Sequence, residues 1–509
     1  MKTSSLGLLA LAAGFAAAQT VLVNNSICSW EGASLGCQPS FLCDYNTQSD
    51  SCRVKDGVVY RPQQLHLAYA GESAGTGMTV SWATYAEVED SSLWVGSSEE
   101  DLKPVDATLK TLEYYHDENY TMFHHHATVS GLTPHTKYYY KVGSAAQTMY
   151  QSDVHSFITA RSPLDPNMFK AIIYGDAGDG NNSVDTLAYM NSLSSDDVDF
   201  IYHIGDISYA DDDFLVESQV DGFFYEAVYN KWMNSLAPVM SVIPYMVLVG
   251  NHDIECHSPS CLEIEARKEM LSNFSAYNAR WKMPYEESGG ALNMWYSFDH
   301  GPIHWTSLSS ESDYPNSTAN AFIAANATGN FGDQLGWLEA DLMKADANRI
   351  NVPWVFVGMH RPIYNVGGCK NGVPSTETEQ NGYLQSAFEA LLIKYKVDVV
   401  LMGHEHYYER QVPIANNTAV MDGVSADNNT YVNPQAPVYI LTGAAGNIEG
   451  IDPAPENSAP WNAAFDYKNF GFSTLEANRT MLSWKFIKSS DETVLDEFVM
   501  LKTDSALQC

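Results

Sequence analysis

The fold of this chain is decided by the stretch Phe200-Ile201-Tyr202-His203-Ile204-Gly205-Asp206-Ile207-Ser208-Tyr209. Its apolar first part predicts a short buried strand, and the glycine and aspartate that follow predict a turn at the strand's carboxyl end. Ligands of open α/β sheets bind at this edge. Asp206 and Tyr209 are three residues apart, so one tight turn can direct both side chains toward the same point. Taken alone, Gly-Asp after a strand is ordinary turn chemistry.

Four other stretches repeat this pattern of an apolar run, a glycine and a residue that can bind a metal ion. The runs are 171–174, 246–249, 354–357 and 397–402, and they lead to Gly175-Asp176, Gly250-Asn251, Gly358-Met359-His360 and Gly403-His404-Glu405-His406. Together the five stretches offer seven potential ligands: Asp176, Asp206, Tyr209, Asn251, His360, His404 and His406. Each has an ordinary explanation when taken singly, as a turn former, a cap or a buried polar residue. All seven at predicted strand ends indicate one metal site.

The ligand types fall into two groups. Asp176, Asp206 and Tyr209 with one histidine supply anionic oxygens and a nitrogen, which favours a trivalent ion such as Fe(III). Asn251 and two histidines are neutral donors that suit a divalent ion (Zn, Mn or Fe), with Asp206 shared between the two ions. Two cations can clamp the attacking and leaving oxygens of a phosphoryl group, and a metal ion can turn bound water into hydroxide. The set therefore predicts phosphoryl hydrolysis.

The five stretches resemble those of the purple acid phosphatases, which are binuclear metallophosphatases, and in particular the larger plant and fungal type. The resemblance runs from about residue 60 nearly to the C-terminus and fills all seven family ligand positions. It implies that the ferric ion is held by Asp176, Tyr209 and His406, the divalent ion by Asn251, His360 and His404, and that Asp206 bridges them. It also implies a fold of mixed, mainly parallel sheets, an α/β (α+β) metallophosphatase sandwich.

His252, directly after Asn251, matches the family histidine that contacts phosphate and protonates the leaving group. That role suits a histidine, which can donate a proton at mildly acidic pH. The expected catalytic residues are therefore His252 and Asp206, and the expected substrate-binding residues are His252 and Asn251. Metal-bound hydroxide is expected to attack phosphorus in line.

One departure from the plant members concerns the outer part of the substrate site. Plant members have a histidine pair nine and ten residues after the His360 position, where this chain has Cys369 and Lys370. The groups that contact the rest of the substrate must therefore differ. Glu405, between two histidine ligands, is interpreted as a supporting residue, and His203, inside a predicted strand, as a packed core histidine.

The N-terminal part of the chain predicts secretion. Residues 1–18 combine Lys2, an apolar stretch and three alanines, which is typical of a signal peptide, and the apolar stretch is shorter than the roughly 20 residues that span a membrane. Residues 19–59 form a Cys-rich segment. Its four cysteines predict two disulfides of open connectivity (Cys28, Cys37, Cys43 and Cys52), Cys256 and Cys261 are expected to close a small loop, and Cys369 and Cys509 remain for a long-range pair.

Residues 60–160 predict a β domain and residues 168–509 the catalytic domain. The alternation in 78–82 and the turn 131–134 before Tyr138 resemble a fibronectin type III-like β-sandwich, in which a tyrosine hydroxyl bonds back to the turn. The triplet His124-His125-His126 cannot easily converge on one ion, because neighbours on a strand point to opposite faces, so we interpret it as surface or domain-interface histidines. The prolines of 161–166 predict a linker. Residues 412–436, which are polar, predict a surface loop.

Composition narrows the function further. The chain has 509 residues, 45% hydrophobic and 17% charged, as expected for a globular protein of two or more domains, and a formal net charge of −35. Such acidity argues against nucleic-acid partners, and no run predicts a membrane span. Nine sequons predict N-linked glycans, at Asn24, Asn119, Asn181, Asn273, Asn316, Asn326, Asn416, Asn428 and Asn478.

The sequence thus predicts a secreted acid phosphatase, extracellular or in the cell wall or vacuole, that hydrolyses small phosphate monoesters at a Fe(III)–divalent centre. Two alternatives remain. A binuclear phosphodiesterase generally lacks the tyrosine ligand, so Tyr209 argues against it. A catalytically weak cell-surface binding protein would have lost ligands. Phytate, sugar phosphates, nucleotides and phosphoproteins stay open as substrates, and a homodimer stays open as the assembly.

Overall fold

The computed structural model describes residues 58–503 apart from 118–119, 216–222, 255, 257, 318–329, 367–379 and 455–458. Before residue 58 it describes only the antiparallel strands β1 (Phe41–Cys43) and β2 (Cys52–Val54). Several sequence predictions concern residues or side chains that the structure does not describe. These are the signal peptide, the pairing of the N-terminal cysteines, Cys369, Lys370 and Cys509. The predicted disulfide between Cys256 and Cys261 is confirmed.

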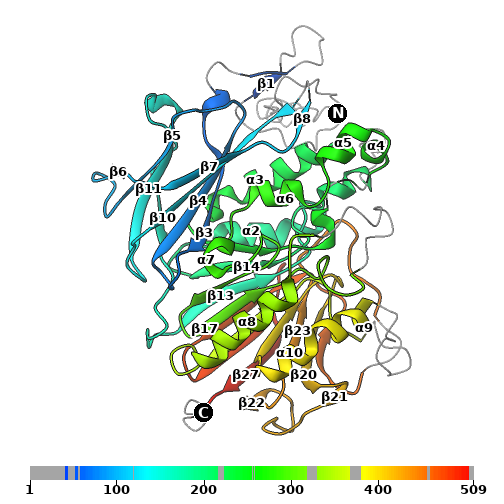
Figure 1. Ribbon diagram of the computed structural model, residues 1–509. Helices are drawn as coiled ribbons and strands as arrows, with labels where there is room; N and C mark the ends of the chain where they lie inside the picture. Colours follow the sequence, from blue (N-terminus) through cyan, green and yellow to red (C-terminus); the bar gives the residue numbers. More distant parts are fainter. Residues whose placement is uncertain are drawn as a thin grey trace, which may run out of the picture.

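The first domain is a β-sandwich, drawn in blue and cyan in Figure 1. One sheet has the order β3 (Gln63–Ala70), β4 (Gly77–Thr84), β10 (Phe123–Ser130) and β7 (Thr108–Leu112), and the other β12 (His155–Ile158), β11 (Lys137–Ser144), β5 (Ser91–Gly96) and β6 (Lys103–Pro104). The Thr133 N–H donates to the Tyr138 hydroxyl at 3.1 Å, so the predicted tyrosine corner is confirmed.

The histidine triplet lies on β10 and is buried, so its interpretation as surface histidines is wrong, and the interface alternative applies to His126. His125 stacks on Trp82 inside the sandwich, with ring centroids 5.2 Å apart. His126 Nε2 lies 2.9 Å from the Ala279 carbonyl oxygen in the second domain. The side of β10 and β4 that the sequence would leave to solvent is covered, because the second domain packs against it.

The second domain contains two mixed sheets. The seven-stranded sheet has the order β15 (Tyr245–Leu248), β14 (Phe200–Ile204), β13 (Phe169–Tyr174), β25 (Gly471–Ala477), β26 (Met481–Lys488), β27 (Val494–Leu501) and β22 (Thr430–Val432). The eight-stranded sheet has the order β16 (Tyr296–His300), β17 (Ile303–Ser307), β18 (Trp354–Gly358), β19 (Val399–Met402), β23 (Val438–Thr442), β20 (Tyr408–Ala415) and β21 (Thr418–Ala419), and β24 (Asn462–Asp466) pairs with β20.

All five predicted apolar runs form strands, namely β13, β14, β15, β18 and β19. The neighbours β13–β14–β15 are parallel, and so are β17–β18–β19–β23. Most of the remaining pairs are antiparallel, with β22 and β27 as a parallel exception. Parallel pairing is therefore concentrated in the strands whose carboxyl ends carry the predicted ligands.

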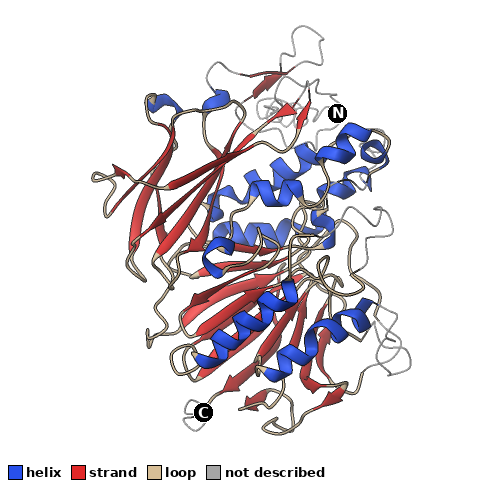
Figure 2. Cartoon of the chain, in the orientation of Figure 1, coloured by secondary structure: helices blue, strands red, loops and turns tan. Residues whose placement is uncertain are grey.

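Helices cover the two sheets from outside. Figure 2 shows α2 (Val184–Ser192) and α3 (Tyr225–Met240) on one side and α8 (Gln334–Ala347) and α10 (Ala390–Lys394) on the other. Smaller helices are α4 (Pro259–Leu262), α5 (Glu265–Met270), α6 (Ser275–Arg280), α7 (Tyr285–Ser288) and α9 (Gln380–Leu384). Among the described residues, no helix combines the length and the apolar character that a membrane crossing requires.

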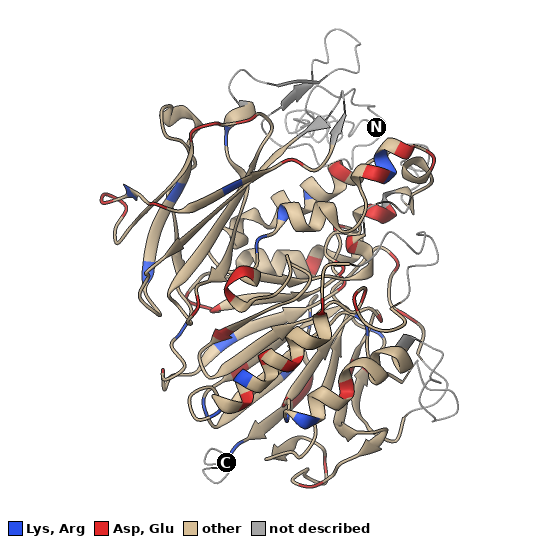
Figure 3. Cartoon of the chain, in the orientation of Figure 1, with Lys and Arg blue, Asp and Glu red and all other residues tan. Residues whose placement is uncertain are grey.

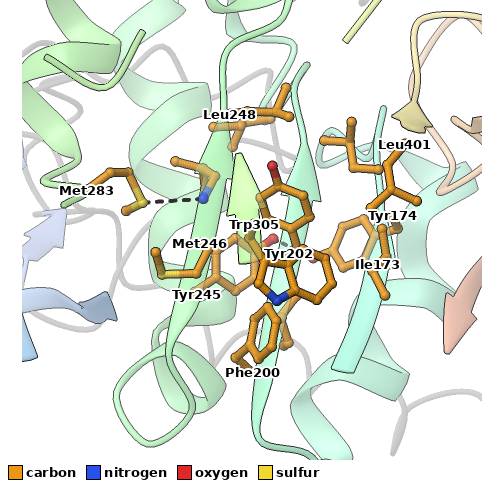
Figure 4. Packing of buried hydrophobic residues seen from close by; sticks show 14 of the residues in the cluster. Ile173, Tyr174, Phe200, Tyr202, Tyr245, Met246, Leu248, Met283, Trp305 and Leu401 are labelled. Carbon is orange, nitrogen blue, oxygen red and sulfur yellow. Dashed lines mark hydrogen bonds between the residues drawn. The ribbon is translucent and has the colours of Figure 1, made fainter. Parts of the chain in front are cut away.

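The core lies between the two sheets (Figure 4). Phe200 and Tyr202 of β14 meet Trp305 of β17 edge-on, with ring centroids 5.2 and 5.4 Å apart. The Tyr202 hydroxyl also lies 2.7 Å from Ser307 Oγ at the end of β17. The Val247 N–H donates to Met283 Sδ at 3.4 Å. Edge-to-face aromatic pairs add directional stability to ordinary burial, so these contacts fix how the sheets dock.

The two domains share a polar, buried contact. β3 packs against α3 and β15, and Gln64 Nε2 donates to Asn230 Oδ1 at 3.0 Å. Arg280 makes a buried ion pair with Glu226 at 2.6 Å. The predicted linker is tied down as well, because Arg161 bonds Asp165 and Asp199.

The region predicted as a surface loop, residues 412–436, differs from that prediction. It contains the end of β20, the short hairpin strand β21 and strand β22, which pairs with β27. Tyr431 of β22 is fully buried and hydrogen-bonds Arg410. The strand β22 was not predicted because its segment is polar. A single buried aromatic residue is enough to anchor it, and one residue does not give a recognisable strand pattern.

Candidate metal centre

The seven predicted ligands all follow strands, and the strands belong to both sheets. In the first sheet, Asp176 follows β13, Asp206 and Tyr209 follow β14, and Asn251 begins the 3-10 turn η6 (Asn251–Asp253) after β15. In the second sheet, His360 follows β18, and His404 and His406 follow β19. Backbone bonds join the two edges, for example from the Gly175 N–H to the Thr442 carbonyl at 3.0 Å. The ligands therefore gather where the carboxyl ends of two sheets meet.

Tyr209 is the centre of one half of this cluster. Its hydroxyl lies 3.3 Å from Asp176 Oδ1, 3.4 Å from Asp206 Oδ2 and 3.0 Å from His406 Nε2. His406 Nε2 lies in turn 3.7 Å from Asp176 Oδ1. These four side chains present two carboxylates, a phenol and an imidazole toward one point.

His360 is the centre of the other half. Its Nε2 lies 2.9 Å from Asp206 Oδ2 and 3.2 Å from Asn251 Oδ1. His360 Nδ1 lies 2.9 Å from the Ile204 carbonyl oxygen, which fixes that nitrogen as the donor and directs Nε2 to the cluster. His404 joins here, since Asp206, His360 and His404 offer ligand atoms within 4.8 Å of one another. Asp206 thus contacts both halves.

Four of the predicted ligands have left-handed backbone conformations. The φ angles are 61° at Asp176, 50° at Asp206, 53° at Tyr209 and 73° at His404. Non-glycine residues held in this region cost about 1–3 kcal/mol each, and such residues persist where the surrounding structure enforces them. The His404 N–H donates to Asp176 Oδ2 at 3.1 Å, and the His252 N–H donates to Asp206 Oδ1 at 2.7 Å. These bonds hold the strained turns in place.

Three of the glycines that precede predicted ligands have a steric reason. A Cβ on Gly250 would lie 2.2 Å from Asp206 Oδ1, and a Cβ on Gly403 would lie 2.7 Å from Asp176 Oδ2. A Cβ on Gly205 would lie 2.7 Å from His360 Nδ1. The recurrent glycine therefore lets ligands of neighbouring strands approach each other across the backbone.

The cluster buries two carboxylates and a phenol in contact with one another, namely Asp176, Asp206 and Tyr209. Burial raises the pKa of Asp176 well above its usual range, and burial together with the charges of Asp176 and Asp206 raises that of Tyr209. Burial alone would raise the pKa of Asp206, but His360 and His252 lower it. Buried carboxylates and a phenol in contact are costly unless a cation accompanies them. The donor set therefore fits metal ions.

His252 lies at the edge of the cluster and stacks on Tyr209, with ring centroids 4.4 Å apart. Its Nδ1 lies 3.0 Å from Asp211 Oδ2, and its Nε2 lies 3.8 Å from Glu449 Oε2. Burial lowers the pKa of His252, but the charges of Asp211 and Asp206 raise it well above its usual value. Sequence reasoning missed Asp211 and Glu449, although Asp211 lies only two residues beyond Tyr209.

Asp253 was missed as well. Its carboxylate accepts hydrogen bonds from the backbone N–H groups of Gly250 at 2.7 Å, Asp206 at 3.2 Å and Ile207 at 3.2 Å. It thereby joins the turn after β14 to the turn after β15. Its position two residues after Asn251 was the only signal in the sequence.

His203, interpreted as a core histidine, has that role. It is fully buried on β14, and its Nδ1 lies 2.8 Å from the Tyr245 hydroxyl. Burial raises the pKa of Glu405, interpreted as a supporting residue, to about 7.

Three family models match the chain. They are "Purple acid Phosphatase, N-terminal domain" at residues 62–159, "Calcineurin-like phosphoesterase" at 149–408 and "Iron/zinc purple acid phosphatase-like protein C" at 436–497. The second of these matches covers the strand ends that carry all seven predicted ligands.

Named relatives cover most of the chain. An acid phosphatase of Aspergillus ficuum is 30% identical over 75% of this chain and 76% of its own length, and acid phosphatase A of Cryphonectria parasitica is 30% identical over 87% and 92%. A phosphoenolpyruvate phosphatase of Allium cepa is 30% identical over 85% and 80%. The structure of a purple acid phosphatase from yellow lupin seeds superposes with a TM-score of 0.69 at 23% identity, covering 88% of this chain and 76% of that one, which shows the shared fold.

Proposed function

The chain belongs to the purple acid phosphatase family, and we propose that its metal centre holds one Fe(III) and one divalent ion. The protein is an acid phosphatase, a binuclear metallophosphatase that hydrolyses phosphate monoesters. In the proposal the ferric ion is held by Asp176, Tyr209 and His406, the divalent ion by Asn251, His360 and His404, and Asp206 bridges the two. Residues 168–509 carry this chemistry, since residues 60–160 contribute no ligand.

The observation that carries the assignment is the position of Asp206. Its Oδ2 lies 3.4 Å from the Tyr209 hydroxyl and 2.9 Å from His360 Nε2. A carboxylate in contact with both halves of the cluster is placed to bridge two ions. The division between the halves also agrees with ligand preference, because the phenol and carboxylates suit a trivalent ion and the amide and imidazoles a divalent one. Zn, Mn and Fe all accept that second donor set.

When bound, two such ions supply an activated water molecule and neutralise charge on the phosphoryl oxygens. The chain's own residues do the rest. Asn251 offers its side-chain amide N–H to a phosphate oxygen. His252 is held by its Nδ1 contact with Asp211 and by stacking on Tyr209. A histidine fixed in this way can hold a proton on Nε2 and transfer it to the departing alkoxide.

The proposal includes secretion and N-linked glycosylation, and these rest on the signal-peptide pattern and the nine sequons. Asn181, Asn273 and Asn416 begin sequons and are exposed, so their side chains are accessible for modification. For the substrate, we propose small phosphate monoesters, with phytate included.

The test is a visible absorption spectrum of the purified protein, with total metal counted on the same sample. We expect about two metal ions per chain and a broad visible band, because tyrosinate on ferric iron absorbs by charge transfer. Tyr209→Phe should lose the band. Tyr202→Phe is the matched control, since Tyr202 is buried in the core with a hydroxyl bonded to Ser307, and it should keep the band.

A colourless protein with two divalent ions would overturn the ferric assignment and favour a centre of the phosphodiesterase kind. A parallel assay with 4-nitrophenyl phosphate and bis(4-nitrophenyl) phosphate separates these alternatives. We expect faster hydrolysis of the monoester at mildly acidic pH.

A further inference from the structure

Arg361 stands beside the metal centre and belongs to no ligand set. It directly follows His360 at the end of β18 and is mostly buried, with 18% of its side chain exposed. Its Nη1 lies 2.9 Å from His404 Nε2. Its Nε donates to both oxygens of Glu311, at 3.1 and 2.8 Å. A permanently charged guanidinium therefore reaches the wall of a site built to handle phosphate.

The loop after β17 holds Arg361 in place. The Arg361 backbone N–H donates to Ser310 Oγ at 2.8 Å, and the Ser310 hydroxyl donates to Glu311 Oε1 at 2.9 Å. With the Nε contact to Glu311, these bonds close a ring between the loop and Arg361. Gln334 of α8 fastens the loop from behind, by two bonds from its amide N–H groups to the Ser309 and Ser312 carbonyls at 3.0 Å.

The contact with His404 has a specific consequence. Arginine has only donors, so His404 Nε2 must be the nitrogen with the lone pair. One lone pair cannot accept the Arg361 N–H and coordinate a metal ion at once. If His404 binds a metal ion through Nε2, this N–H of Arg361 is released beside the ion, while the Nε contact with Glu311 is left intact.

We propose that Arg361 is a substrate-binding residue, whose released N–H donates to a non-bridging oxygen of the substrate phosphate. The proposal rests on the metal-binding function proposed above for His404. Arginine recognises phosphate through charge-assisted hydrogen bonds in a fixed fork. Glu311, only 6% exposed, neutralises the guanidinium and so permits it to lie close to two cations. The ring of bonds orders Arg361 before substrate arrives, which lowers the entropy lost on binding.

The test compares Arg361→Gln and Arg361→Lys with wild type in the metal-loaded, full-length enzyme. Inorganic phosphate is the probe, as a competitive inhibitor of 4-nitrophenyl phosphate hydrolysis, and total metal is counted for every variant. Lys394→Gln is the control, because it removes one positive charge from an exposed ion pair with Glu339. Glu311→Gln removes the negative charge that pairs with Arg361 and leaves the arginine itself unchanged.

We expect Arg361→Gln to weaken phosphate inhibition about tenfold and to raise KM about tenfold, because one charged hydrogen bond to phosphate is lost. The metal content of this variant should be unchanged. Arg361→Lys should recover part of the inhibition as a point charge. Glu311→Gln should weaken it less than Arg361→Gln, and Lys394→Gln should match wild type. Unchanged phosphate inhibition in Arg361→Gln, or a fall in its metal content that accounts for the lost activity, would overturn the proposal. Metal-free wild-type protein would instead overturn the proposed function.

Discussion

At the scale of single residues, Asp253 connects two of the ligand-bearing turns through three backbone N–H groups. We predict that Asp253→Asn lowers the free energy of unfolding by about 2–3 kcal/mol, since the new NH₂ must face a backbone N–H donor and both groups are left buried without an acceptor. Metal content should fall as well, because the turns after β14 and β15 then separate. Chemical denaturation and metal analysis measure both effects.

Asp185→Asn is the matched control for this substitution. Asp185 is exposed on α2, and exposed substitutions usually change stability by less than about 0.5 kcal/mol. An Asp253→Asn variant as stable and as metal-loaded as this control would show that the connection between the turns is dispensable.

At this scale the sequence predicts the ligands but not their supports. Asp176 and His360, for example, each follow an apolar run and a glycine, so the sequence next to them is enough to predict their position at a strand end. Two of the three Asp253 bonds and all of the Arg361 bonds reach turns and loops that are distant in the chain, and no spacing encodes those bonds. Lys370, one of the two residues in place of the plant histidine pair, lies outside the described residues.

At the scale of elements, the turn after β15 passes so close to β14 that its glycine has no substitute. We predict that Gly250→Ala abolishes metal binding, because a Cβ there would lie 2.2 Å from Asp206 Oδ1 and 2.4 Å from Asp206 N. Activity should fall by at least a hundredfold, as about 3 kcal/mol of lost transition-state stabilisation implies. Metal counts and kcat with 4-nitrophenyl phosphate measure the two effects.

Gly180→Ala provides the comparison on the same side of the molecule. A Cβ on Gly180 would lie 3.8 Å from Ile448 Cα, which is ordinary contact. This variant should keep its metal and its activity. Normal metal content in Gly250→Ala would show that the turns can separate without losing the site.

The strands themselves were predictable, because each of the five runs is short, apolar and followed by turn residues. The assignment of β13, β14 and β15 to one sheet and of β18 and β19 to another was not visible in those runs, since a buried parallel strand has the same pattern in either sheet. The packing of two sheets in the catalytic domain was predicted only through the family resemblance. Strand β22 was missed because only Tyr431 marks it as buried.

At the scale of the whole molecule, pH acts on the contact between the domains. Burial lowers the pKa of His126 to about 3, whereas an unfolded histidine titrates near 6.5. Between these values the unfolded chain binds a proton that the folded chain does not, so stability falls as the pH falls, by about 1.4 kcal/mol per pH unit for one such group. Denaturation midpoints from pH 7 to 4 should show this contribution on top of those of other buried histidines whose pKa burial lowers, such as His66 and His125.

We predict that His126→Gln makes the slope shallower by the contribution of this one group, and that His135→Gln, a change at an exposed histidine of the same domain, leaves it unchanged. A His126→Gln variant with the wild-type slope would contradict the prediction. The acidic surface works in the opposite direction. Acidic side chains are spread over many elements (Figure 3), and with a formal net charge of −35 their mutual repulsion decreases as they protonate.

Because the predicted ligands are divided between two sheets, the metal centre can form only after the two sheets have folded and packed together. The first sheet brings Asp176, Asp206, Tyr209 and Asn251, and the second brings His360, His404 and His406. Neither sheet carries the full set of ligands, so high-affinity metal binding requires that the two sheets have docked. A chain that stalls before this step is inactive as well as unfinished. We therefore expect premature catalysis inside the producing cell to be prevented by the order of assembly, without a separate inhibitor.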